Sequence, residues 1–117
     1  MVLLVEDEEA VREVAEEHLS GQGYRVSAFR SAVEAVAGLE ALGRVDAVVT
    51  DVVMPGMSGT ELVHTVRGRW PGLPVVYISG HAGDAFGEID VEAPRTAFLQ
   101  KPFRLDDLEK ALCRVLE

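Results

Sequence analysis

The sequence predicts an α/β fold: a single doubly wound, five-stranded parallel sheet with helices on both faces. The first observation is that short apolar runs alternate with stretches whose apolar residues recur at helical spacing. The second is that the run Val2–Val5 is apolar at every position, which is typical of a strand covered on both faces. The third is that the connections are short, which favours parallel strands joined by right-handed crossover helices.

The first half of the chain predicts three strands and two helices. Residues 2–5 are the first strand, residues 24–29 the second and residues 45–50 the third. From Ala10 the apolar period becomes helical, and this helix ends at Gly21 and Gly23, because glycine is common at helix ends. Residues 31–42 predict one further helix, since Ser31 and Glu34 have capping-box spacing and Gly43 closes the segment.

The second half predicts two more strands and two clear helices. Ser58 and Glu61 repeat the capping-box spacing and open a helix that ends before Pro71. Residues 74–78 and 96–99 are the fourth and fifth strands, and residues 105–116 form an amphipathic last helix. Between residues 81 and 95, glycines and a proline leave room for a short helix near residues 84–89, which we expect to be poorly ordered.

The composition bounds the class of protein. A chain of 117 residues that is 48% apolar can bury one core, so we expect one domain over residues 1–117. The net charge of −9 argues against nucleic acid or an anionic membrane as a direct partner. The single Cys113 excludes an internal disulfide and fits a reducing, cytoplasmic setting. We expect neither a membrane span nor a signal peptide, because no apolar run is long enough and no basic leader precedes the first strand.

Asp51 stands at the end of the predicted third strand, where a carboxylate needs a partner. A buried charge is costly unless it is paired, and neither lysine nor arginine lies between Arg44 and Arg67. The carboxyl ends of parallel strands meet at one edge of a doubly wound sheet. We therefore expect Asp51 to lie near the polar residues that follow the other strands, which are Glu6, Asp7, Ser79 and Lys101.

Together these residues form a set suited to phosphoryl transfer. Three carboxylates at one place repel one another and attract a cation, and oxygen ligands favour Mg2+. Lys101, the Ser79 hydroxyl and the Gly80 amide could bind phosphoryl oxygens, with Asp51 as the nucleophile. Each residue also has an ordinary interpretation, because acids cap helices, serines occupy turns and lysines lie at surfaces.

The ordered motifs resemble the receiver domain of bacterial two-component response regulators over the whole chain. They are Leu4-Val5-Glu6-Asp7-Glu8, Asp51-Val52-Val53-Met54-Pro55-Gly56, Ile78-Ser79-Gly80 and Phe98-Leu99-Gln100-Lys101-Pro102-Phe103. The sequence of these motifs is most similar to that of receivers of hybrid sensor histidine kinases. The resemblance implies a flavodoxin-like sheet in the order 2-1-3-4-5.

The resemblance also implies roles for individual residues. Asp51 would accept a phosphoryl group from the phosphohistidine of a histidine kinase or phosphotransfer protein. The Mg2+ ligands would be Asp7, Asp51 and the backbone carbonyl of Val53, with Glu6 acting at the metal directly or through water. Lys101 and Ser79 would hold phosphoryl oxygens, Phe98 would be the switch aromatic, and the Lys101–Pro102 peptide would be cis. Whether the chain is free-standing or attached to a kinase or output domain stays open.

The implied switch couples Ser79 to Phe98. Phosphorylation adds charge and acceptor oxygens at Asp51, which would attract the Ser79 hydroxyl. The vacated volume would admit the ring of Phe98 and alter the surface made by residues 81–95, the fifth strand and the last helix. The chain departs from the commonest family pattern at Glu6, Ser79 and Phe98, where aspartate, threonine and tyrosine are frequent.

Three other functions fit the pattern less well. A magnesium-dependent phosphohydrolase that forms an aspartyl phosphate would usually carry a second carboxylate at the position of Val53. A flavodoxin-like cofactor binder would need a phosphate loop after the first strand, where the acidic run of residues 6–9 repels phosphate. A receiver used only for docking would not need the complete set of polar groups. We therefore expect a switch that promotes only its own phosphorylation and dephosphorylation, not an enzyme acting on other substrates.

The remaining candidate residues have structural interpretations. His18 lies on the apolar stripe of the first helix and is interpreted as a packed or edge histidine. His64 is interpreted as a surface residue and His81 as a loop residue near the site. Neither the histidines nor Cys113 form a zinc motif or a nucleophilic triad in the sequence. Trp70 and Cys113 are interpreted as packing residues.

Overall fold

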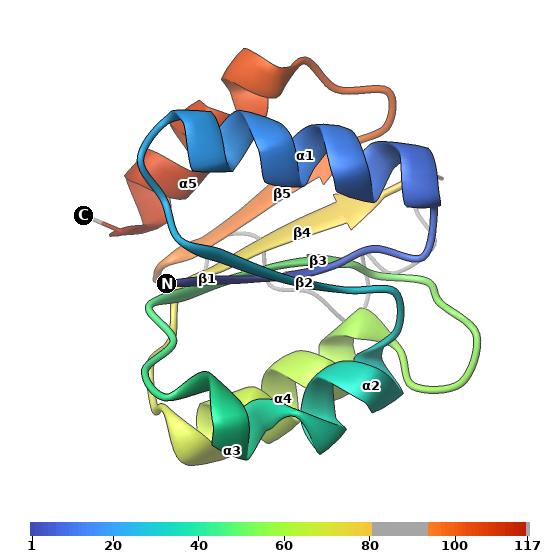
Figure 1. The fold of residues 1–117 in the computed structure, drawn as a ribbon, viewed down its shortest axis with the longest axis vertical. Coiled ribbons are helices and arrows are strands. Elements are labelled where there is room, and N and C mark those ends of the chain that lie inside the picture. The colour runs from blue at the N-terminus through green and yellow to red at the C-terminus, as the bar shows by residue number, and fades with distance from the viewer. Residues whose placement is uncertain (81–93, 117) are drawn as a thin grey trace.

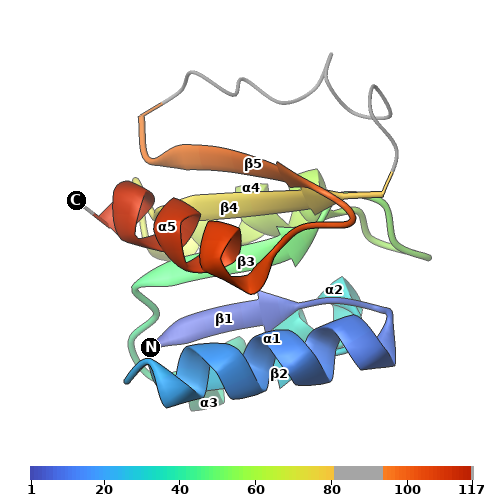
Figure 2. The ribbon, with the colours of Figure 1, turned by 90° about the horizontal axis from the view of Figure 1, so that it is seen from above.

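The structure is a computed structural model that describes residues 1–80 and 94–116. Five parallel strands form one sheet in the order β2-β1-β3-β4-β5 (Figures 1 and 2). The predicted fold class and strand order are therefore confirmed. The strands are β1 (Val2–Val5), β2 (Val26–Phe29), β3 (Ala47–Asp51), β4 (Val75–Ser79) and β5 (Thr96–Gln100).

Helices cover both faces of the sheet, as Figure 1 shows. Helices α1 (Glu9–Gly21) and α5 (Leu105–Leu116) lie on one face. Helices α2 (Ala32–Ala37), α3 (Leu39–Leu42) and α4 (Gly59–Arg69) lie on the other. None of these described helices is long and apolar enough to cross a membrane. The short helix expected near residues 84–89 falls outside the described part of the chain.

Two apolar cores follow from the alternation of side chains along the strands. In β1, Leu3 and Val5 pack into the core beneath α2, α3 and α4, whereas Val2 and Leu4 pack beneath α1 and α5. All four side chains are buried, which explains why the sequence of this strand is apolar without interruption. Among the described residues, the buried polar side chains lie at or next to the ends of strands: Glu6, Thr50, Asp51 and Ser79.

The helix expected over residues 31–42 is in fact two helices, so that prediction was wrong. Ser31 caps the start as expected, with its hydroxyl accepting a hydrogen bond from the Glu34 amide. Helix α2 then ends at Gly38, and α3 begins immediately after it. An added Cβ at Gly38 would lie 3.4 Å from the ring of Phe29, so the glycine leaves space for this aromatic contact. Glycine also weakens a helix interior, which explains the break.

The strand boundaries differ from the predicted ones by one or two residues, and the differences bear on the site. Strand β3 begins at Ala47 and extends to Asp51, one residue beyond the predicted end. Strand β4 likewise extends to Ser79. The backbone continues the sheet pattern past Asp51, because the Val52 amide donates to the Ile78 carbonyl at 2.9 Å. Asp51 and Ser79 are thus held by regular strand structure.

Candidate functional site

The site is built at the carboxyl ends of four strands. Glu6 follows β1, Asp51 ends β3, Ser79 ends β4 and Lys101 follows β5. Figure 2 shows β1, β3, β4 and β5 pointing to the same side, so these residues share one edge. Glu6, Asp51 and Ser79 are buried, although each is polar. Buried polar residues are costly without partners, so the contacts of each one decide what this edge can do.

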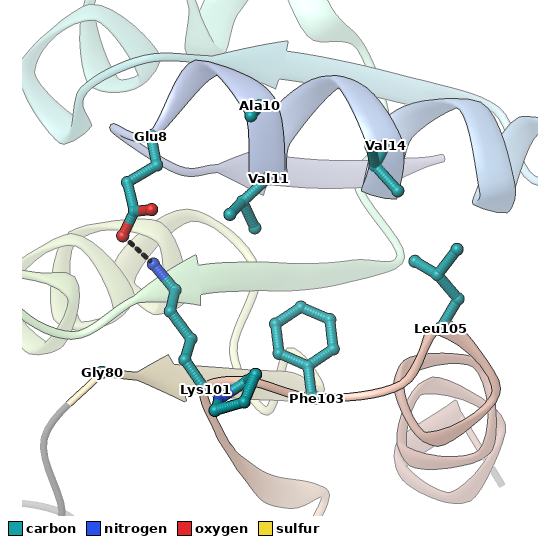
Figure 3. A pocket seen from close by; sticks show the side chains of 9 residues that line it. Glu8, Ala10, Val11, Val14, Gly80, Lys101, Phe103 and Leu105 are labelled. Carbon is teal, nitrogen blue, oxygen red and sulfur yellow. Dashed lines mark hydrogen bonds and ion pairs between the residues drawn. The ribbon is translucent and has the colours of Figure 1, made fainter.

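Lys101 is the centre of the group. Its ammonium nitrogen Nζ donates to Glu6 Oε1 at 3.0 Å and to Asp51 Oδ2 at 3.1 Å. A third bond of 2.8 Å goes to Glu8 Oε1, and Figure 3 shows this contact from close by. Carboxylate oxygens of Glu6, Glu8 and Asp51 lie within 4.8 Å of one another. The ammonium of Lys101 thus binds all three carboxylates, and its positive charge compensates their mutual repulsion.

Glu6 is the most buried member of the group. Its side-chain oxygen Oε1 accepts hydrogen bonds from the Glu8 amide at 3.1 Å and from Lys101. Its other oxygen, Oε2, is buried and has no hydrogen-bond partner among the described residues. The pKa of Glu6 is raised from 4.5 to about 7, chiefly by burial. The neighbouring charge of Asp51 acts in the same direction, whereas the hydrogen bonds from the Glu8 amide and Lys101 oppose the rise. Glu6 therefore takes up a proton readily in the absence of a metal.

Asp51 is held from both sides. Its oxygen Oδ2 accepts from Lys101, and Oδ1 accepts from the Val53 amide at 3.3 Å. Burial raises the pKa of Asp51, and the hydrogen bond and charge of Lys101 oppose this effect. Burial alone would lower the pKa of Lys101, but its bonds to the three carboxylates outweigh burial and raise that pKa above its usual value. Lys101 is consequently a permanent cation at this edge.

The backbone around Lys101 is tied to β4. The Lys101 amide donates to the Ser79 carbonyl at 2.7 Å, which extends the β4–β5 pairing to the site. A Cβ added at Gly80 would lie 3.9 Å from the Lys101 side chain, so Gly80 sits directly against the lysine stem. The Lys101–Pro102 peptide bond is cis. The structure thus brings the predicted residues Glu6, Asp51, Ser79, Gly80 and Lys101 into one place.

Phe98 lies on β5 beside the site. It pairs with Tyr77 of β4 in the sheet register and is partly buried. Its ring packs against the apolar core shared with α2 and α4. Ser79 lies on β4 two positions after Tyr77, so the two residues of the expected switch occupy neighbouring strands.

Of the neighbouring residues Asp7 and Glu8, Glu8 is the one that contacts Lys101. Asp7 is exposed and does not belong to the carboxylates around Lys101, although its charge adds to burial in raising the pKa of Asp51. Glu8 was not predicted as a site residue, yet it contacts Lys101 directly. It occupies the N-cap position of α1 without making a side-chain cap, because its carboxylate points to the lysine instead.

The donor chemistry of the group fits a hard divalent cation. Every side-chain donor in it is a carboxylate oxygen, and Glu6 Oε2 is a buried oxygen that lacks a hydrogen bond within the described structure. Mg2+ prefers oxygen ligands and commonly uses one or two carboxylates. The expected backbone ligand Val53 follows Asp51 by two residues, with its side chain exposed and its amide bonded to Asp51.

The loop after β3 is fixed by a close approach of α4. The Gly59 amide donates to the Val52 carbonyl at 2.8 Å, and a Cβ added at Gly59 would lie 2.1 Å from the Asp51 carbonyl oxygen. Only glycine allows this approach. Ser58 and Glu61 form a full capping box at the start of α4, as predicted, and Gly56 turns the loop with a φ of +80°. The helix start thereby buttresses the backbone that carries Asp51.

An apolar groove adjoins the polar group. It has a volume of about 670 Å3 and runs between the first turns of α1 and the loop from β5 to α5. Its walls include Val11 and Val14 of α1, together with Phe103 and Leu105 (Figure 3). Glu8 and Lys101 lie at one end of the groove, so the groove and the carboxylate group are continuous.

Relatives with a similar sequence are parts of longer signalling proteins. The sensor kinase CckA of Brucella abortus is 43% identical over 117 residues, which cover 99% of this chain and 12% of that protein. The C4-dicarboxylate transport transcriptional regulatory protein DctD of Rhizobium meliloti is 33% identical over 116 residues, or 99% of this chain and 25% of that protein. The chain thus spans a quarter or less of the length of these two relatives.

Solved structures and a family model agree with this match. A response regulator receiver protein from Sinorhizobium medicae superposes with a TM-score of 0.87 at 31% identity, covering 98% of this chain and 92% of that one. The receiver domain of the hybrid histidine kinase CckA superposes with a TM-score of 0.81 at 33% identity, covering 99% of this chain and 98% of that one. The model of the response regulator receiver domain matches residues 2–113. The chain therefore belongs to the receiver domain family of two-component response regulators.

Proposed function

We propose that Asp51 accepts a phosphoryl group from the phosphohistidine of a histidine kinase or phosphotransfer protein. The observation that carries this proposal is the ammonium of Lys101, which lies 3.1 Å from Asp51 Oδ2 at the ends of the strands. In the step, a carboxylate oxygen of Asp51 forms a bond to phosphorus while the phosphorus–nitrogen bond of the donor breaks. The donor imidazole leaves as a neutral base once it has taken up a proton.

The metal in this reaction is proposed to be Mg2+, held by Asp7, Asp51 and the backbone carbonyl of Val53, with Glu6 beside it. The support is that Glu6 and Asp51 belong to a group of carboxylate oxygens, and that one buried Glu6 oxygen lacks a hydrogen bond within the described chain. When bound, the ion would supply positive charge that offsets the negative charge of the phosphoryl group. Asp7 is exposed, so it can approach such an ion from the solvent side.

Phosphoryl oxygens are proposed to bind Lys101, the Ser79 hydroxyl and the Gly80 amide. Lys101 is already beside Asp51, and its contacts with Glu6 and Glu8 keep it extended toward the acceptor. Ser79 ends β4, and Gly80 rests against the lysine stem. A hydrogen bond between the hydroxyl and a charged phosphoryl oxygen is worth about 1.5–3 kcal/mol, which is enough to shift a two-state equilibrium.

The response to phosphorylation is proposed to pass from Ser79 to Phe98 and from there to the outer surface of β5 and α5. Support comes from the neighbouring strands on which the two residues lie and from the packing of Phe98 at the core boundary. We assign the chain the role of a switch that turns over only its own phosphoryl group, in the cytoplasm, where a lone cysteine stays reduced.

The phosphodonor protein is proposed to contact the apolar groove beside Lys101. A phosphohistidine must approach the exposed end of the polar group, and the groove begins at Glu8 and Lys101. Val14 is half exposed within it, which leaves apolar surface available to a partner.

The deciding experiment is intact-mass measurement after incubation with a small phosphodonor, with and without Mg2+. Wild type should gain one phosphoryl adduct only with the metal, and Asp51→Asn should gain none. An adduct of unchanged yield in Asp51→Asn would refute Asp51 as the acceptor. Turnover of unrelated phosphate esters would instead indicate a phosphohydrolase, and no adduct under any condition would indicate a docking module.

A further inference from the structure

A second group of metal-ligating side chains lies between α1 and α5, apart from the carboxylates around Lys101. The two helices lie side by side on one face of the sheet (Figures 1 and 2). His18 comes from the last turn of α1, and Asp106 and Glu109 come from the first half of α5. One ligand atom of each residue lies within 4.8 Å of the other two. The fold therefore brings a nitrogen donor and two oxygen donors together from positions distant in sequence.

The imidazole of His18 has an atom without a hydrogen bond at this place. Its nitrogen Nε2 is buried and finds no hydrogen-bond partner within the described residues, while 19% of the side chain is exposed. Glu109 Oε2 lies 3.6 Å away, which is too long for a hydrogen bond. Two ligands of a tetrahedral zinc ion with bonds of about 2.0–2.1 Å lie about 3.3 Å apart. The observed separation is close to the distance that a shared ion would impose.

The carboxylates of Asp106 and Glu109 would also be stabilised by a cation. Asp106 and Glu109 are three residues apart on α5 and so lie on the same face of the helix, where like charges repel. A protonated His18 would form an ordinary ion pair with Glu109, but this pair would not compensate the charge of Asp106. A divalent ion compensates both carboxylates and uses the His18 nitrogen at the same time. Because imidazole favours transition metals over Mg2+, the donor set is selective as well.

We propose that His18, Asp106 and Glu109 form a binding site for a divalent transition-metal ion of the zinc type, with a fourth position open to water. This site is separate from the proposed phosphorylation site, because it shares no residue with the group around Lys101. The bound ion joins α1 to α5, and binding to the folded state alone raises the unfolding temperature. The proposal adds a ligand role to the interpretation of His18 as a packed or edge histidine.

The test follows zinc binding through the side-chain nitrogens of the three histidines by NMR, in excess Mg2+. The Mg2+ competes for the oxygen-only site around Asp51, whose described members Glu6, Glu8 and Asp51 include no histidine. The expected result is that the His18 nitrogens shift and saturate at one equivalent of Zn2+, while those of His64 stay unchanged. Equal shifts at His18 and His64 would mean adventitious surface binding and would overturn the proposal.

Matched variants complete the test. Changing even an outer-shell partner of a metal ligand costs about 10–100-fold in affinity, so His18→Gln should weaken zinc binding at least about tenfold. Glu109→Gln should weaken it as well while preserving the shape of the side chain. His64→Gln, on the exposed side of α4, should leave the affinity unchanged within about twofold. Unchanged affinity in His18→Gln, with circular dichroism showing a folded chain, would reduce the group to an ordinary ion pair.

Discussion

Lys101 Nζ lies 3.1 Å from Asp51 Oδ2, although the two residues are 50 positions apart in the sequence. The contact exists because β3 and β5 run parallel and end at the same edge, with β4 between them. It places a permanent cation beside the proposed acceptor before any phosphoryl group is present. The same ammonium also holds Glu6 and Glu8, so it contributes to stability as well as to the proposed reaction.

Removing the charge of Lys101 should destabilise the metal-free domain. Lys101→Met leaves three carboxylates without their cation, and hydrogen bonds to charged groups contribute roughly 1.5–3 kcal/mol. We expect the free energy of unfolding in urea with EDTA to fall by about 2 kcal/mol. Lys110→Met is the matched control, because Lys110 is exposed on α5, and it should change stability by less than about 0.5 kcal/mol. Equal effects of the two substitutions would contradict the central role given to Lys101.

The raised pKa of Glu6 predicts a pH dependence of stability. The carboxyl titrates at about 7 in the folded chain against an ordinary 4.5, so between these values the folded state binds more protons than the unfolded state. Stability must then fall as the pH rises through this window. Without metal, we expect a loss on the order of 1–2 kcal/mol between about pH 5.5 and 7.5. Asp46 has a lowered pKa and the opposite sign, but it acts only at more acidic pH.

The glutamine variant isolates this effect. Glu6→Gln cannot titrate, so urea unfolding across the same pH range should show a flatter profile than wild type. Glu40→Gln changes an exposed glutamate on α3 and should keep the wild-type slope. Saturating Mg2+ should weaken the slope in wild type, because a bound cation favours the ionised carboxylate. A wild-type slope that persists in Glu6→Gln would assign the titration to another group.

The edge of the sheet was predictable, because the rule that parallel strands end together needs only the order of the elements. Asp51, Ser79 and Lys101 each stand at the end of an apolar run, so their meeting follows from the pattern. The choice between Asp7 and Glu8 could not be read in this way. Both lie in one acidic run, and which of them faces Lys101 depends on the backbone turn between β1 and α1.

The end of helix α2 could not be predicted from the sequence pattern. Its apolar spacing continues through residues 31–42, and the break at Gly38 depends on a contact with Phe29 that is absent from the local pattern. The group of His18, Asp106 and Glu109 was hidden for the same reason. Its members come from two helices whose facing sides are decided by packing against the sheet, so no spacing within either helix signals it.

Substituting Gly59 should disrupt the backbone around Asp51. An alanine Cβ would lie 2.1 Å from the Asp51 carbonyl oxygen, so α4 or the end of β3 must move. Overpacking of this kind costs about 1–3 kcal/mol or more, so Gly59→Ala should lower the unfolding midpoint and the rate of phosphorylation together. Gly68→Ala on the same helix meets open space and should stabilise the chain by about 0.5–1 kcal/mol. A fully stable, active Gly59→Ala would show that the close approach is unimportant.

Ser79 provides a test of the proposed switch. Ser79→Ala removes the hydroxyl, so phosphorylation should no longer shift the ring resonances of Phe98 in NMR spectra, even where intact mass shows the adduct. Ser79→Thr keeps a hydroxyl and should retain the shift. A full phosphorylation-dependent shift of Phe98 in Ser79→Ala would sink the proposed coupling between these two residues.

The groove predicts a difference between protein and small-molecule phosphodonors. Val14 is 50% exposed on α1 within the groove, and a carboxylate there would have to be desolvated when an apolar partner surface covers it. The phosphodonor for this test is the histidine kinase or phosphotransfer protein that phosphorylates wild type fastest. Val14→Glu should therefore slow phosphoryl transfer from this protein by about tenfold. The rate with a small phosphodonor should stay unchanged, because the polar group around Lys101 is intact. Val33→Glu is the matched control, since Val33 is 57% exposed on α2 away from the groove, and it should affect neither rate. If Val14→Glu and Val33→Glu slowed protein transfer equally, the effect would be one of net charge, and the groove would lose its proposed role.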